Sequence, residues 1–63
     1  DPAVWAAVDQ LAPKQRAVIA LHYLEDLPVA EIAEIMEISL SAATSNLHKA
    51  RANLADTLGE SHG

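Results

Sequence analysis

Apolar residues recur along this chain at intervals of three and four positions, the spacing of residues on one face of an α-helix. No stretch shows the strict alternation that is typical of a β-strand. Three prolines interrupt the pattern, and each stands where a helix can begin, since proline is tolerated in a first turn. The pattern therefore predicts four helices, which begin at Asp1-Pro2, at Pro13, at Pro28 and after a capping Ser39.

The apolar stripes of these helices are expected to meet in the core of one all-α domain. The first helix ends before Pro13, the second closes at Glu25-Asp26-Leu27, the third ends near Met36, and Gly59 is expected to stop the fourth. Trp5 is expected to anchor the core, because large aromatic side chains lie mostly buried. Residues 61–63 are expected to fray. The expected inward residues are Val4, Trp5, Val8, Leu11, Ala17, Val18, Leu21, Leu24, Val29, Ile32, Ala33, Met36, Leu40, Ala43, Leu47, Ala50, Leu54 and Leu58.

The last two predicted helices, with a short turn between them, form a helix-turn-helix pattern over residues 27–54. Such a pair holds its second helix so that the outer face of that helix can enter the major groove of DNA. With the leucines of the fourth helix turned inward, its polar and small residues face outward. The outward set is Ser41, Ala42, Thr44, Ser45, His48, Lys49 and Ala52, with Asn46 and Arg51 nearer the flanks.

The length and composition limit the chain to a few classes of protein. Its 63 residues suffice for one domain, and Ala, Leu and Ile carry most of the apolar content. No cysteine is present, which excludes disulfides and cysteine-bound zinc and fits a reducing cytosol. No apolar run approaches the roughly 20 residues that span a bilayer, and no signal peptide is seen. We expect a cytoplasmic protein without a membrane partner, and, because the chain begins at Asp1, a piece of a longer one.

The charge is unevenly distributed along the chain. The net charge is −5, which opposes binding to DNA phosphates. Residues 25–37 hold five acids and no base, whereas Lys49 and Arg51, beside His48, are the only charged residues from Ile38 to Ala55. The predicted fourth helix is therefore locally basic on an acidic domain.

Catalysis, metal binding and cofactor binding find little support. His22, His48 and His62 lack the close spacing of metal ligands. Ser45 and His48 lie one turn apart on an exposed face, with neither a pocket nor an orienting acid. We expect no catalytic residue, no metal and no cofactor.

Several of these segments together resemble a known family. They are residues 11–36, which contain Leu-Ala-Pro-Lys-Gln-Arg and Glu-Ile-Ala-Glu-Ile-Met, then Ile38-Ser39, and then Leu47-His-Lys-Ala-Arg-Ala-Asn-Leu54. The ordered combination resembles region four of bacterial RNA polymerase sigma factors, closest to the extracytoplasmic-function group. The likeness runs from about Trp5 to Leu54.

The resemblance implies a non-catalytic domain, residues 1–63, that recognises the −35 promoter element and docks on the flap of the polymerase beta subunit. An anti-sigma protein is a further partner that it implies. The positions matching the family's base readers are Ser45 and Lys49, and Arg16 matches a residue that touches the DNA backbone. His48 and Arg51 also lie at matching positions, although Arg51 could serve the packing side of the helix or a phosphate rather than a base. The candidate DNA-binding set is Arg16, Ser41, Thr44, Ser45, His48, Lys49 and Arg51.

The chain departs from the family at the turn and at the start of the fourth helix. The family usually has Gly at the turn followed by Thr-Val-Lys-Ser-Arg, whereas here Glu37 occupies the turn and Ala42-Ala-Thr-Ser-Asn46 follows. Two expected cations are thus missing, although Thr44 and Asn46 can still form hydrogen bonds, and Asn suits the edge of adenine. We expect weak DNA affinity that depends on the holoenzyme.

Two alternatives remain at this point. One is a helix-turn-helix output domain of the response-regulator type, against which the Leu-x-Pro-x-x-Arg and His-Lys-Ala-Arg segments argue. The other is a protein-interaction module that keeps the fold but has lost affinity for DNA, which the net charge permits.

Overall fold

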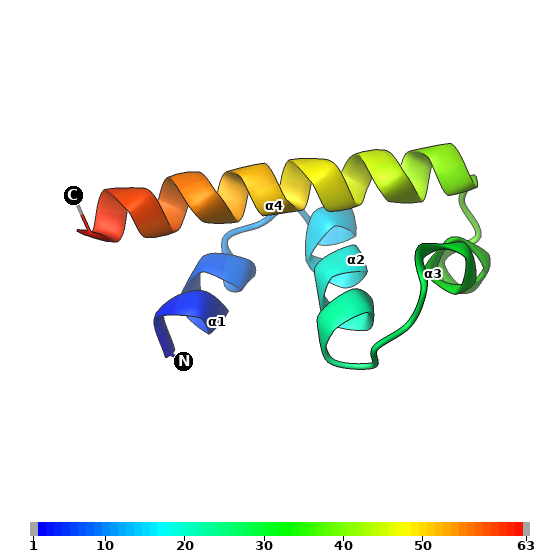
Figure 1. Ribbon diagram of the computed structural model, residues 1–63, viewed down its shortest axis with the longest axis horizontal. Coiled ribbons are helices and arrows are strands. Elements are labelled where there is room, and N and C mark those ends of the chain that lie inside the picture. The colour runs from blue at the N-terminus through cyan, green and yellow to red at the C-terminus, as the bar shows by residue number, and fades with distance from the viewer. Residues whose placement is uncertain (1, 63) are drawn as a thin grey trace.

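Four helices follow one another in the computed structural model, which describes the backbone of residues 2–62 and the side chains of residues 2–59. The helices are α1 (Pro2–Asp9), α2 (Pro13–Tyr23), α3 (Val29–Met36) and α4 (Leu40–His62). Helix α4 runs along the whole length of the molecule (Figure 1). All three shorter helices pack on it, with α3 near its N-terminal end. The predicted all-α fold is confirmed.

The core lies between α4 and the three shorter helices. Helix α4 contributes Ala43, Leu47 and Ala50, which are spaced by four and three positions as the sequence predicts. Ile32 of α3 and Val18 of α2 are fully buried, and each apolar side chain of this size stabilises the fold by roughly 1.5–3 kcal/mol. The central cluster consists of Val8, Leu11, Val18, Ile19, Ile32, Leu47 and Ala50.

Three residues that were expected to face the core lie at the surface instead. Trp5 is 43% exposed, Leu24 is 60% exposed and Leu40 is 56% exposed. Leu24 follows the last residue of α2 and Leu40 is the first residue of α4, so the neighbouring helices do not cover these ends. The buried residues of α1 are Ala7 and Val8, which leaves Trp5 only partly covered.

The turn between α3 and α4 is closed by backbone hydrogen bonds. Glu37 adopts the left-handed conformation, with φ 57° and ψ 44°. Its backbone N–H donates to the carbonyls of Ala33 and Glu34, and the N–H of Ile38 donates to Ala33 at 3.0 Å. This is a Schellman-type helix end, in which glycine is the usual left-handed residue. Glutamate is strained there, because its Cβ crowds the following carbonyl.

The start of α4 agrees with the prediction from the sequence, and its end does not. At its start, Ser39 Oγ accepts a hydrogen bond from the N–H of Ala42 at 3.0 Å, which confirms the predicted cap. At its other end, the expected stop at Gly59 is wrong, because α4 continues to His62. Gly59 has no positive φ and so does not form the left-handed cap on which that expectation depended. Of the expected frayed tail, residues 61 and 62 lie in α4, and residue 63 lies outside the described residues.

None of the described helices combines the length and the apolar character needed to cross a lipid bilayer.

Candidate nucleic-acid interface

The N-terminal half of α4 presents a polar face to solvent. The cap at Ser39 and the burial of Ala43 and Leu47 fix the rotation of this half against the domain. The opposite face is therefore directed outward. Its exposed polar side chains are Ser41, Thr44, Ser45, His48 and Lys49, which we call the α4 outer face.

The α4 outer face has hydrogen-bonding capacity that the fold does not use. Among the described residues, none of its five side chains takes part in an intramolecular hydrogen bond or ion pair. Hydroxyl groups can donate and accept, and an ammonium group can donate to phosphate or to guanine. Such a row of polar groups on an exposed helix can read base edges.

The electrostatics near this face are mixed. Lys49 is the single lysine or arginine in the set, whereas Glu31 and Glu34 on α3 and Glu37 in the turn are all exposed. In helix-turn-helix complexes the first helix of the pair crosses the DNA backbone, so carboxylates on α3 oppose close approach of phosphates. Favourable charge is confined to the neighbourhood of Lys49.

Asn46 lies at the margin of this surface and is half-buried. Its Nδ2 donates to the backbone carbonyl of Ala42 one turn earlier, at 2.9 Å. The amide thus serves the helix itself in this conformation, and would have to rotate before it could meet a base.

Arg16 lies on α2, apart from the α4 outer face in the chain and in its contacts. Its Nη1 donates to the backbone carbonyl of Asp9, the last residue of α1, at 3.3 Å. The side chain remains exposed. It therefore connects α2 to the end of α1, and no contact among the described residues joins it to the α4 outer face.

Arg51, the other cation of α4, is directed toward α2. Its Nε donates to the Tyr23 hydroxyl at 3.0 Å, and its guanidinium carbon lies 5.7 Å from the centre of the Tyr23 ring. Its Nη2 lies 3.3 Å from His22 Nε2. His22 Nδ1 in turn lies 3.1 Å from the carbonyl oxygen of Leu27. Of the roles that the sequence left open for Arg51, the structure shows a contact on the packing side of the helix.

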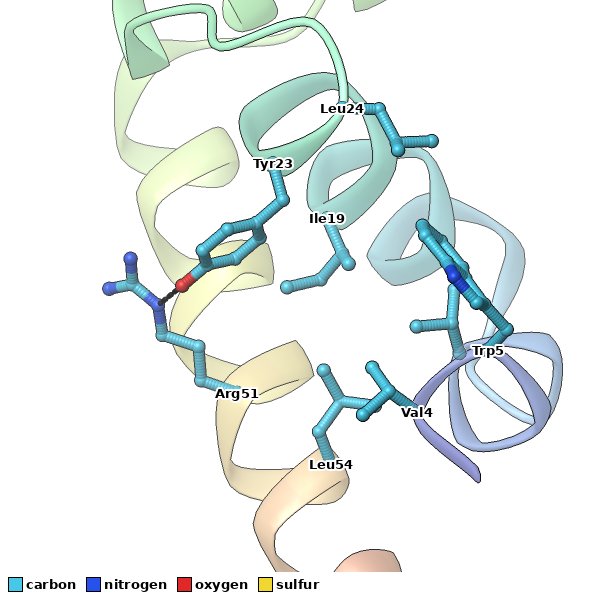
Figure 2. Close-up of a pocket in the computed structure, with 8 residues that line it drawn as sticks. Val4, Trp5, Ile19, Tyr23, Leu24, Arg51 and Leu54 are labelled. Carbon is cyan, nitrogen blue, oxygen red and sulfur yellow. Dashed lines mark hydrogen bonds between the residues drawn. The ribbon is translucent and has the colours of Figure 1, made fainter. Parts of the chain in front are cut away.

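An apolar groove opens beside Arg51, between α1, α2 and the C-terminal half of α4 (Figure 2). It encloses about 340 Å³. This groove was not predicted from the sequence, where the one available signal was a tryptophan on a helix too short to bury it. The groove is lined by Val4, Trp5, Val8, Ile19, Tyr23, Leu24, Arg51 and Leu54.

A metal site has no structural support within the described part of the chain, where no three His, Asp or Glu side chains gather at a distance suited to one ion.

The chain matches one protein family and is similar in sequence to several known proteins. Residues 2–54 match the family described as sigma-70, region 4. A UPF0122 protein of Anoxybacillus flavithermus is 44% identical over 46 residues, which are 73% of this chain and 42% of that protein. An RNA polymerase sigma-E factor of Streptomyces antibioticus is 38% identical over 52 residues, which are 82% of this chain and 29% of that protein. The chain thus spans less than half the length of these relatives. No solved structure shows significant similarity to it.

Proposed function

The chain belongs to the sigma-70 region 4 family, a family of DNA-binding helix-turn-helix domains of sigma factors, and we propose that it recognises the −35 promoter element during transcription initiation. In this proposal the α4 outer face enters the major groove, and Ser45 and Lys49 meet base edges. Ser41, Thr44 and His48 complete the contact surface, while Arg16 steadies the DNA backbone. The domain acts by binding, as expected for a regulatory domain, and not by catalysis.

The observation that carries this proposal is the contrast between the two sides of α4. Ala43, Leu47 and Ala50 are buried, while the polar side chains across the helix are exposed and free of intramolecular hydrogen bonds. A polar outer face also keeps a surface helix solvated, but here it lies on the second helix of a helix-turn-helix in a chain that matches sigma-70 region 4. A recognition helix requires it.

The charge of the domain limits its own affinity for DNA. Each phosphate that a cation neutralises contributes to affinity through the release of counterions, and the α4 outer face offers only Lys49 for this. The rest of the holoenzyme therefore has to hold this domain at its site. The family match favours this function over a response-regulator output domain. The similarity to a sigma-E factor supports the extracytoplasmic-function group within the family.

A second part of the proposed function is docking on the RNA polymerase core, at the flap of the beta subunit. The groove of Figure 2 supports it, because the groove lies beside the C-terminal half of α4, while the α4 outer face belongs to the N-terminal half. The domain can then contact core and promoter together. A module that only bound proteins would dock on the core but would give no promoter footprint in the holoenzyme.

The test of DNA recognition is a footprint and a salt titration with holoenzyme that contains this chain. Lys49→Ala should weaken binding to all sequences and reduce the slope of log affinity against log salt by about one unit. Lys49→Arg should restore the slope, because the charge is kept. Ser45→Ala should leave the slope unchanged and relax the preference for particular bases. An unchanged slope in Lys49→Ala, together with an unchanged base preference in Ser45→Ala, would refute the proposed recognition.

A further inference from the structure

We propose that Leu40 is a specificity-determining residue, which recognises the 5-methyl group of a thymine at one edge of the contact between α4 and the major groove. The inference rests on the proposed recognition of the promoter by the α4 outer face. It adds an apolar contact to the polar ones assigned there.

Leu40 is exposed on the helix that the proposed function places in the major groove. Among the described residues, four other large apolar side chains are exposed: Trp5, Tyr23 and Leu24, which line the apolar groove of Figure 2, and Ile35 of α3. Leu40 is the one that α4 carries, and it is 56% exposed. A single exposed leucine is common at protein surfaces, so the place of this one on the helix is what distinguishes it.

Leu40 is continuous with the α4 outer face. Thr44 and His48 follow it at intervals of four positions, and side chains four positions apart on a helix are neighbours, with roughly 5–6 Å between their Cβ atoms. All three side chains are exposed. They therefore form one row along α4, in which an apolar side chain precedes two polar ones.

The place of Leu40 at the start of α4 is the one from which base edges are reached. In helix-turn-helix complexes the N-terminal residues of the second helix contact the bases. Leu40 is the first residue of α4, directly after the cap in which Ser39 Oγ accepts a hydrogen bond from the N–H of Ala42. The cap fixes the backbone at this point, so Leu40 is positioned before any DNA is bound.

The chemistry of Leu40 selects among the groups that the major groove displays. An aliphatic side chain forms no hydrogen bond, so the ring nitrogens, carbonyl oxygens and amino groups of the bases offer it no partner. The 5-methyl group of thymine is the apolar group at a base edge in this groove, and apolar side chains pack on it. This contact needs no cation, which suits a surface where Lys49 is the single lysine or arginine.

The test is a methyl-interference measurement with holoenzyme that contains this chain. Duplexes that the holoenzyme binds tightly are selected from a pool with a randomised −35 segment. Each thymine is then replaced in turn by deoxyuridine, which lacks only the 5-methyl group. At one position the replacement should weaken binding roughly two- to five-fold, as expected when one buried methyl group is lost. Because the phosphates are unchanged, this ratio should be the same at low and at high salt.

Variants of the chain assign the methyl contact to a side chain. Leu40→Ala should bring the thymine-to-deoxyuridine ratio to about one, whereas Leu40→Met, which keeps an apolar side chain of similar size, should retain it. Ile35→Ala is the matched control, because it removes a comparably exposed aliphatic side chain from α3, and it should retain the ratio. Thr44→Ser removes a methyl group next to Leu40 but keeps the hydroxyl, and it should also retain the ratio.

Three results would overturn the inference. An unchanged ratio in Leu40→Ala would show that Leu40 does not contact the methyl group. A ratio lost in Thr44→Ser and retained in Leu40→Ala would assign the contact to Thr44 instead. If no thymine is sensitive to replacement, the domain reads no methyl group, and the salt titration of Lys49 still tests promoter recognition separately. Should Leu40→Ala prevent assembly of the holoenzyme, Leu40→Ser replaces it and should likewise give a ratio of about one.

Discussion

The two halves of α4 use their polar side chains in opposite ways. In the N-terminal half, the exposed side chains of Thr44, Ser45 and Lys49 form no hydrogen bond or ion pair with the described residues. In the C-terminal half, Arg51 binds Tyr23 of α2, and Asn53 Nδ2 donates to Gln15 Oε1 at 2.8 Å. The polar side of this one helix is therefore free in the N-terminal half, and it is hydrogen-bonded to α2 in the C-terminal half.

This difference shows how a very small domain can leave one polar surface free of internal contacts without losing its fold. The polar contacts and the groove are gathered where α1 and α2 cover α4. The N-terminal half depends instead on its buried apolar side and on the cap and turn that precede it. Substitutions in the two halves should consequently have separable effects on stability and on binding.

The largest effect is expected in the core against which α4 packs. Ile32 is fully buried in the core, and Ile32→Ala should lower the free energy of unfolding by roughly 2–4 kcal/mol. That is a large share of the stability available to a domain of this length. Denaturant titration followed by circular dichroism measures it. Ile35→Ala, on the same helix at a position 58% exposed, is the matched control and should change stability little. Equal losses in the two variants would contradict the assigned core.

A smaller loss is expected at the start of the N-terminal half. Ser39→Ala removes the acceptor for the Ala42 N–H and should cost about 1 kcal/mol of unfolding free energy. Thermal unfolding compared with Ser41→Ala, which removes an exposed hydroxyl that caps nothing, isolates the contribution of the cap. A cost shared by both variants would show that the loss does not arise from capping.

The turn before α4 should respond in the opposite direction. Glu37→Gly relieves a left-handed residue and should stabilise the domain by roughly 0.5–1 kcal/mol. Asp26 also has a positive φ, of 56°, but aspartate tolerates this region better than glutamate. Asp26→Gly should therefore give a smaller gain in the same denaturant titration. The reverse order of the two gains would show that strain at Glu37 is offset by another contact.

The smallest effects separate the two halves most directly. Asn53→Ala should cost roughly 0.5 kcal/mol of stability through the lost hydrogen bond to Gln15, and should leave promoter binding unchanged. Ser45→Ala should leave thermal stability unchanged and alter base preference. If Ser45→Ala is destabilised, the polar side of the N-terminal half also forms stabilising contacts within the domain. The two halves would then not differ in this respect.

The periodicity of the sequence predicts the helices and much of the core, because a buried stripe on a helix is a local property. Leu47 and Ala50 lie inward as expected, and the cap at Ser39 follows from residue type and position alone. The errors at Trp5 and Leu24 have a common cause. Periodicity indicates which face of a helix is apolar, but the degree of burial depends on whether another helix reaches that point. Ile19, which is 3% exposed, was missed because four other apolar residues lie within two positions of it.

The residues of the candidate site also differ in whether the sequence could place them. That α4 would have a polar outer face with Ser45 and Lys49 on it follows from the 3.6-residue turn of a helix, which acts over neighbouring positions only. The direction of Arg51 depends on Tyr23, which is 28 positions earlier in the chain. The groove beside it needs three helices to meet. The sequence by itself determined the polar outer face of α4. Only the packing of α1 and α2 on α4 decided where the side chain of Arg51 and the apolar groove lie, because contacts between distant segments depend on how helices cross and not on their periodicity.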